Sequence, residues 1–259
     1  MALPTRLRLS HPDPGAVQAT ADRPGTELPG AFAASSHAGT IPVVPGALHD
    51  RDEGGPMSSR PEAPAGTEVL ADLSPGRHVH LVGIGGIGLS AMARILLQRG
   101  YDVSGSDLGL SPITRDLAAL GATIHEGHTA QNVNDSDLVI VSSAVPDGNP
   151  EVEAARAAGI PVIKRGEALA WLMRGRQGIA VAGTHGKTTV SAMVGLELLQ
   201  GGLDPTILVG GIIPELQSNS RDGSGPHFVV EADEYDRTFL KLTPQVAVVT
   251  SIEMDHPCL

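Results

Sequence analysis

The chain has 259 residues, of which 41% are hydrophobic and only 2% aromatic, so its core must be built from Val, Ile, Leu and Ala. That composition is typical of parallel α/β sheets, whose strands are buried on both faces. The net charge of −11 excludes a general nucleic-acid-binding surface, because affinity for the phosphate backbone needs clustered cations. No apolar stretch approaches a membrane span and there is one cysteine, so we expect a cytoplasmic protein that is not inserted in a membrane.

Residues 1–75 differ in composition from the rest of the chain, since they hold 11 of the 20 prolines and no lysine. A stretch without a sustained apolar period cannot bury enough apolar surface to offset its ordering entropy. We therefore expect residues 1–75 to be a disordered extension. A true start at Met57 would remove most of it.

Strands and helices are expected to alternate from His78 onward. Apolar runs typical of strands occur at 78–84, 101–105, 138–142, 160–163, 179–182, 206–209, 228–231 and 246–251. Helical patterns occur at 89–99, 114–120, 150–158 and 189–199. This alternation predicts an α/β fold with parallel sheets. Two glycine-rich strand-to-helix turns, about a hundred residues apart, indicate a Rossmann-like domain over 76–175 and a P-loop α/β domain over 176–259.

The first glycine-rich turn has the pattern G-x-G-x-x-G through Gly83, Gly85 and Gly88. Such a turn, between a strand and a helix, places a pyrophosphate against the N-terminus of the helix. Asp107 lies near the end of the next predicted strand, where an acid that binds a ribose is expected. The pattern fits NAD, FAD or a nucleotide sugar equally well, and a tight turn that binds nothing has the same form.

The second turn follows an apolar strand and contains one of the few lysines of the chain. Its glycines let backbone N–H groups surround phosphate oxygens, Lys187 can reach the outer phosphates, and the Thr188 hydroxyl can ligate the Mg²⁺ of a nucleoside triphosphate. The strict Walker pattern has a glycine where this chain has Val181. The strand–loop–helix context nevertheless predicts a triphosphate site at Gly183, Thr184, His185, Gly186, Lys187, Thr188 and Thr189.

Two later apolar strands run into polar residues of the kind that hold metal ions. The strand at 228–231 ends at Glu231, and in P-loop proteins an acid at the end of a neighbouring strand holds Mg²⁺. Glu231 directly follows two valines, where a carboxylate would be costly without a cation. The three carboxylates after it fit a solvated loop as well as a metal site. The strand at 246–251 leads to His256, a candidate metal ligand.

These motifs together resemble the Mur ligases, the ATP-dependent amide-forming ligases of peptidoglycan precursor synthesis, over residues 78–256. The first glycine turn, Asp107 and the segment at 142–151 are similar to the UDP-substrate domain of that family. The second glycine turn, the acidic run and the segment at 250–256 are similar to the start of its ATPase domain. The histidine within the phosphate loop favours the ligase that joins L-alanine to UDP-N-acetylmuramate.

The resemblance implies a reaction and assigns each motif a role in it. ATP phosphorylates the lactyl carboxylate of UDP-N-acetylmuramate, and the amine of L-alanine attacks the resulting acyl phosphate. By this resemblance the catalytic residues are Lys187, Glu231 and His256, and the Mg²⁺ ligands are Thr188, Glu231 and His256. The turn from Gly183 to Thr189 binds ATP. The UDP substrate is expected at Gly85, Gly86, Gly88, Asp107 and Ser142.

Members of the family continue for roughly another domain and a half past this point, so the chain resembles their N-terminal portion. We therefore expect little or no ligase activity from the chain alone. A non-catalytic module that binds a nucleotide sugar and ATP is the alternative hypothesis. A two-loop oxidoreductase or kinase is a third hypothesis, which the carboxylates and His256 disfavour.

Overall fold

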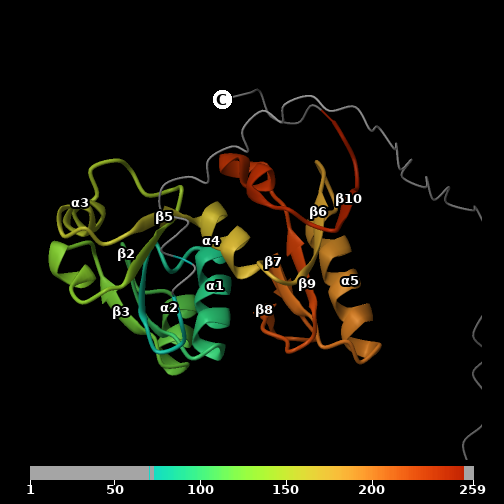
Figure 1. Cartoon of the computed structure of the whole chain (residues 1–259), viewed down its shortest axis with the longest axis horizontal. Helices are drawn as coiled ribbons and strands as arrows, with labels where there is room; N and C mark the ends of the chain where they lie inside the picture. The colour runs from blue at the N-terminus through green and yellow to red at the C-terminus, as the bar shows by residue number, and fades with distance from the viewer. Residues whose placement is uncertain (1–69, 71–72, 254–259) are drawn as a thin grey trace, which may run out of the picture. The chain divides into compact units, whose positions relative to one another are not determined.

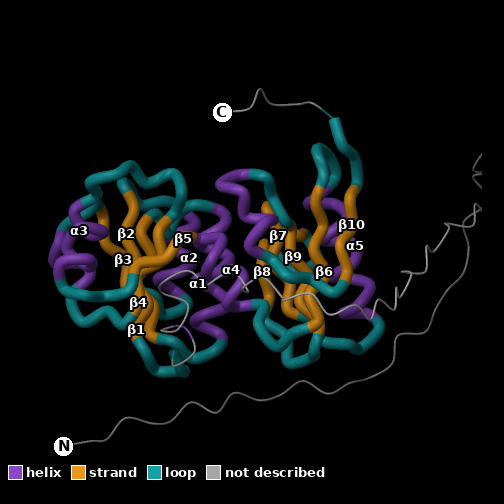
Figure 2. Tube along the Cα trace, turned by 45° about the horizontal axis from the view of Figure 1, so that its top comes forward, coloured by secondary structure: helices purple, strands orange, loops and turns teal. Residues whose placement is uncertain are grey.

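The computed structural model describes Leu70 and residues 73–253. These residues build two five-stranded sheets with helices packed beside them (Figure 1). Figure 2 shows the strands β1–β5 as one group and β6–β10 as another. Most of the expected extension over 1–75 lies outside the described residues, as does His256. The domain boundaries stay a prediction.

The first sheet has the strand order β3-β2-β1-β4-β5, and all its neighbouring strands pair in parallel. Its order reverses between β1 and β4, and ligands of open α/β sheets bind at the carboxyl edge of such a switch point. The strands are β1 (His78–Val82), β2 (Asp102–Asp107), β3 (Thr123–Glu126), β4 (Leu138–Val141) and β5 (Val162–Lys164). The helices are α1 (Ile87–Gln98), α2 (Pro112–Ala119), α3 (Pro150–Ala157), α4 (Arg165–Leu172) and the short 3₁₀ helix η2 (Ala130–Val133).

The second sheet has the order β10-β6-β9-β7-β8 and is parallel except for the antiparallel pair of β7 with β8. The strand β6, which leads into the second glycine turn, lies between β10 and β9. The strands are β6 (Gln177–Ala182), β7 (Thr206–Ile213), β8 (Ser218–Arg221), β9 (His227–Glu231) and β10 (Val246–Val249). The helices are α5 (Lys187–Gln200) and the 3₁₀ helix η3 (Tyr235–Lys241).

The core is aliphatic, as the composition requires. Strand residues such as Val79, Leu81 and Val229 are fully buried, and Phe228 is the only aromatic side chain among the buried hydrophobic residues that the structure describes. Residues of both sheets share one cluster of buried side chains, in which α1 supplies Met92 and Ile95. None of the helices formed by the described residues has the length and apolar character needed to cross a bilayer.

The predicted fold class is confirmed, and every predicted strand and helix corresponds to an observed one within a few residues. The elements not predicted are two strands, β3 and β8, the helix α4 and the two short 3₁₀ helices η2 and η3. The sequence of β8 is Ser-Asn-Ser-Arg and that of β3 is Thr-Ile-His-Glu, so neither carries an apolar run, and each lies at a sheet edge. The antiparallel β8 departs from the expected parallel arrangement.

Candidate functional site

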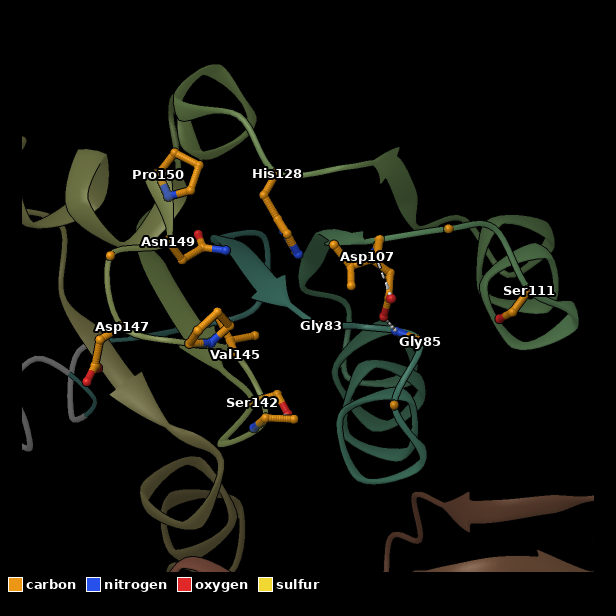
Figure 3. A pocket seen from close by; sticks show the side chains of 16 residues that line it. Gly83, Gly85, Asp107, Ser111, His128, Ser142, Val145, Asp147, Asn149 and Pro150 are labelled. Carbon is orange, nitrogen blue, oxygen red and sulfur yellow. Dashed lines mark hydrogen bonds between the residues drawn. The ribbon is translucent and has the colours of Figure 1, made fainter.

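A pocket of about 630 Å³ opens where β1, β2 and β4 end, at the switch point of the first sheet (Figure 3). Of the residues predicted to bind a UDP substrate, Gly85, Gly86, Asp107 and Ser142 line this pocket. Gly88 does not. It borders a smaller pocket of about 210 Å³, which also includes Gly86 and Ser142. The structure therefore brings four of the five predicted residues together and places the fifth beside them.

The turn after β1 requires glycine, because its backbone passes close to neighbouring chain segments. Gly83 has a φ of +84°, and a Cβ there would lie 3.0 Å from Ser142 Cβ. The N–H groups of Gly83 and Ile84 donate to the carbonyl oxygen of Ser106 at 2.8 and 3.0 Å. The helix α1 starts after Gly86 without a side-chain cap. The first residues of this helix border the smaller pocket, where their N–H groups are donors suited to an anion.

Asp107 is held against the glycine turn by backbone donors. The Gly85 N–H donates to Asp107 Oδ2 and the Leu108 N–H to Oδ1, each at 2.8 Å, and Figure 3 draws the first of these bonds. A Cβ on Gly85 would lie 2.7 Å from the same carboxylate oxygen. Asp107 thus orders the turn. Its predicted contact with a ribose stays a prediction.

Below the pocket lies a buried carboxylate that the sequence analysis did not treat as a site residue. Glu151 is fully buried at the start of α3. It accepts hydrogen bonds from Ser106 Oγ at 2.6 Å, Asn132 Nδ2 at 2.6 Å and His128 Nδ1 at 2.9 Å. Burial raises the pKa of Glu151, but the nearby His80 ring and these hydrogen bonds outweigh burial and lower that pKa to about 2. The carboxylate is therefore ionised at neutral pH.

The low pKa of Glu151 predicts how its contribution to stability depends on pH. The folded-state value of about 2 lies below the ordinary value of 4.5, so the stabilisation is complete above pH 4.5 and is lost as the pH falls toward 2. Glu151→Gln cannot ionise. We expect the difference in unfolding free energy between wild type and this variant to shrink by on the order of 3 kcal/mol over that window.

Urea denaturation at several pH values between 7 and 2.5 measures this difference. Glu153→Gln is the matched control, because Glu153 lies two residues away on α3 with its side chain 58% exposed and pairs with Arg156 at the surface. The control should follow the wild-type pH profile. A constant offset between wild type and Glu151→Gln at all pH values would contradict the prediction.

The second glycine turn joins β6 to α5 and is shaped by two glycines in left-handed conformations. Gly183 has a φ of +130° and Gly186, the N-cap residue of α5, a φ of +81°. A Cβ on Gly183 would lie 2.2 Å from Thr250 Oγ1, so the segment after β10 leaves no room for a side chain. α5 begins at Lys187, two residues earlier than its predicted start, because the Gly186 conformation ends the turn there.

Lys187 folds back over the turn that precedes it. Its Nζ donates to the carbonyl oxygens of Gly183 at 2.7 Å and Thr184 at 3.2 Å, and lies 3.0 Å from Glu234 Oε2. The Lys187 side chain is only 12% exposed. The ammonium group is thus held at the mouth of the loop by oxygen acceptors, which a phosphate oxygen can replace.

The helix α5 and the strands β7 and β9 meet at one carboxylate oxygen of Glu231. Thr188 Oγ1 donates to Glu231 Oε2 at 2.8 Å, and the Gly210 N–H from β7 donates to the same oxygen at 2.7 Å. Glu231 ends β9, which pairs with both β6 and β7. Within the protein a hydroxyl and a backbone N–H bind this carboxylate, and its expected role as a Mg²⁺ ligand stays a prediction.

Two of the three acidic residues after Glu231 are paired with basic side chains, and the side chain of Asp236 lies outside the described part of the chain. Asp233 accepts from Arg165 Nη2 at 2.8 and 2.9 Å, and Glu234 pairs with Lys187. A solvated loop was one expectation for these residues. It fits Glu234, whose side chain is 57% exposed, better than it fits Asp233, whose side chain is 28% exposed. Arg165, the first residue of α4, was not predicted, because it becomes relevant only once α4 lies beside the loop after β9.

The segment after β10 packs against the second glycine turn. The Thr184 N–H donates to the Ser251 carbonyl oxygen at 2.9 Å, the His185 N–H to Ser251 Oγ at 3.1 Å, and the Glu253 N–H to Thr184 Oγ1 at 2.9 Å. His256 lies outside the described residues, so its metal-binding role stays a prediction. Residues 73–253 with Leu70 contain no group of three or more metal-ligating side chains.

Comparison with known proteins gives a consistent result. The model of the Mur ligase family, catalytic domain, matches residues 78–177. The UDP-N-acetylmuramate–L-alanine ligase of Salinibacter ruber is 57% identical over 181 residues, which are 70% of this chain and 38% of the relative. The same-named protein of Laribacter hongkongensis is 55% identical over 180 residues, again 38% of its length. This chain thus spans about two fifths of the curated relatives it matches.

Solved structures agree with the sequence relatives. The UDP-N-acetylmuramate–alanine ligase of Thermotoga maritima is 38% identical with a TM-score of 0.64, over 69% of this chain and 42% of that one. A UDP-N-acetylmuramate:L-alanyl-γ-D-glutamyl-meso-diaminopimelate ligase from Neisseria meningitides is 32% identical with a TM-score of 0.65, over 70% of this chain and 62% of that one. On the family match, the sequence relatives and the shared fold, the chain belongs to the Mur ligase family.

Proposed function

We propose that this chain forms the UDP-substrate-binding and ATP-binding parts of a ligase that joins L-alanine to UDP-N-acetylmuramate through an acyl phosphate. The observation that carries the proposal is the convergence of Lys187, Thr188 and Glu231 on one glycine turn at the end of β6. Relatives named for this activity support it. The nucleotide carrier and ATP are cytoplasmic metabolites, so we propose a cytoplasmic role in peptidoglycan synthesis.

The residues at the second turn fit ATP with Mg²⁺. Mg²⁺ is usually bound by one or two carboxylates together with substrate phosphates, and Glu231 beside the Thr188 hydroxyl offers such a donor set. Their direct hydrogen bond of 2.8 Å shows that the two oxygen donors already lie together. When bound, the cation would neutralise charge on the phosphate oxygens. His256 is the proposed third ligand, by resemblance to the family.

Lys187 and the turn are proposed to position the phosphoryl group that is transferred. Phosphoryl transfer depends on positioning and charge neutralisation more than on covalent help from the protein. Lys187 now binds Gly183 O, Thr184 O and Glu234. On triphosphate binding it exchanges these acceptors for phosphate oxygens, while the N–H groups at the start of α5 face the same anion.

The larger and the smaller pocket adjoin each other, and this arrangement supports a position for the sugar part of the substrate between the UDP end and the second glycine turn. The larger pocket takes the UDP end at the glycine turn after β1. The smaller pocket adjoins it through Gly86 and Ser142 and extends to Arg165 and Asp233. Asp233 is two residues beyond Glu231, so a ligand in the larger pocket that extends through the smaller one points toward the phosphate loop.

Ligand binding to the whole chain tests the proposal. Calorimetry should detect binding of UDP-N-acetylmuramate and no binding of NAD(H), since the same glycine pattern in an oxidoreductase would take the dinucleotide. Binding of NAD(H) without the UDP sugar would refute the ligase proposal.

Catalysis needs a second test, because the chain spans about two fifths of its relatives. The segment 78–253 can replace the corresponding segment of the Salinibacter ruber ligase, and L-alanine-dependent ADP release can be measured. The chimeric enzyme should be active, and its Lys187→Met variant should be inactive. ADP release that never depends on L-alanine would instead favour a nucleotide-binding module without ligase activity.

A further inference from the structure

One side chain in the lining of the larger pocket stands out by its charge. Among the described residues that line this pocket, His128 alone can carry a positive charge, while Asp107 and Asp147 are acidic. The diphosphate of a UDP substrate is an anion, so among these side chains only that of His128 can offer it a positive charge, beside neutral donors such as backbone N–H and hydroxyl groups. Figure 3 shows His128 reaching into the pocket from the loop after β3.

His128 is held from below by the buried Glu151. Its Nδ1 lies 2.9 Å from Glu151 Oε2 and 3.0 Å from Ser106 Oγ. Ser106 donates its own hydrogen to the same carboxylate at 2.6 Å. An ionised carboxylate can only accept hydrogen bonds, so His128 Nδ1 must carry the hydrogen. The ring direction is thereby fixed, and Nε2 is the polar atom of the ring that remains for the pocket.

The other histidine beside Glu151 does not neutralise that carboxylate. His80 is fully buried, its Nδ1 bonds Ser104 Oγ at 2.7 Å, and its Nε2 lies 3.7 Å from Glu151 Oε1, a longer contact than those of Ser106, Asn132 and His128 with that carboxylate. Burial lowers the pKa of His80, against the opposing effect of Glu151, so its ring is neutral at neutral pH. The neighbouring rings of His125 and His78 oppose a charge on His80 as well. Glu151 therefore keeps its negative charge beneath His128.

We propose that His128, oriented by Glu151, binds the diphosphate of the UDP substrate through Nε2. The inference rests on the proposed function, because it names a contact within the same UDP pocket. A histidine whose first nitrogen is fixed by a carboxylate presents its second nitrogen in one direction, as carboxylate–histidine pairs do at metal sites. In the imidazolium form both ring nitrogens carry a hydrogen, and the second nitrogen then donates to a phosphate oxygen, in a pocket whose other ionisable lining residues are acidic. Glu151 acts as a positioning residue, since it touches His128 and not the ligand.

The test compares UDP with uridine, which lacks the diphosphate, on the full chain. His128→Asn keeps an N–H group near the position of Nδ1, and so the bond to Glu151, but removes Nε2. His128→Gln has the reach to place an amide near the position of Nε2. We expect His128→Asn to weaken UDP binding by about tenfold to a hundredfold and to leave uridine binding unchanged. His128→Gln should recover part of the loss.

Calorimetry measures UDP affinity and ligand-observed NMR measures uridine. His125→Asn is the control, because His125 lies on β3 beside His80 and does not line the pocket, so this variant should bind UDP like the wild type. Equal losses for UDP and uridine in His128→Asn, or no loss at all, would overturn the inference and leave the proposed function standing. A wild-type chain that binds neither UDP nor UDP-N-acetylmuramate would overturn the proposed function itself.

Discussion

Lys187→Met is expected to lower the affinity of the chain for ATP by about tenfold to a hundredfold, the effect of losing charged hydrogen bonds to phosphate. Methionine keeps the length of the side chain and removes only the ammonium group. That group lies over the turn, held by Gly183 O, Thr184 O and Glu234. Because Glu234 is 57% exposed, its ion pair contributes little to folding, and we expect the thermal unfolding temperature to change little.

Lys241→Met is the matched control for this variant. Lys241 ends η3 and lies 3.8 Å from Glu167, in a surface pair away from the glycine turn. Calorimetric titration with ATP in the presence of Mg²⁺ should give wild-type affinity for the control. If both variants bind ATP as the wild type does, the phosphate-binding role of Lys187 is wrong.

The glycine turns and the strands that carry them were predictable because their determinants are local. Gly83 and Gly186 have positive φ values at turns between an apolar strand and a helix, and that strand–glycine–helix order is visible in a single sequence. The strand β9 was predicted from its run of apolar residues, and Glu231 stands at its end. Local chemistry therefore identified both glycine turns and the carboxylate beside the second one.

The partners of these residues were not predictable, because they come from chain segments that only the fold brings together. The network around Glu151 uses Ser106 at the end of β2, His128 after β3 and Asn132 in η2. Parallel pairing sets His80 of β1 beside Ser104 of β2, a register that no local pattern specifies.

The same limit applies at the phosphate loop. Glu231 was predicted to bind a cation from its position at the end of an apolar strand, but its partners within the protein, a hydroxyl on α5 and an N–H on β7, could not be read from that position. The ion pair of Arg165 with Asp233 joins α4 to the loop after β9, across 68 positions of sequence. Such pairs follow from sheet order and helix placement, which sequence patterns constrain only weakly.

Glu231→Gln is expected to abolish the dependence of ATP binding on Mg²⁺. Glutamine keeps the shape of the side chain and an oxygen that can accept from Thr188 Oγ1 and the Gly210 N–H, so the loop should remain folded. It lacks the negative charge that attracts a divalent cation. In the wild type we expect ATP to bind roughly tenfold more tightly with Mg²⁺ than with a chelator, the effect of one charge-assisted contact. In the variant that ratio should fall to about one.

Thr188→Val and Glu234→Gln separate this role from nearby effects. Thr188→Val removes the hydroxyl that lies 2.8 Å from Glu231. Because the two side chains serve one cation, the effects of Thr188→Val and Glu231→Gln on the Mg²⁺ dependence of ATP binding should not add. Glu234→Gln removes the same charge from a carboxylate that pairs with Lys187 instead, and should leave the Mg²⁺ dependence intact. If the Mg²⁺ dependence survives in Glu231→Gln and disappears in Glu234→Gln, the cation binds at Glu234 and the role proposed for Glu231 is wrong.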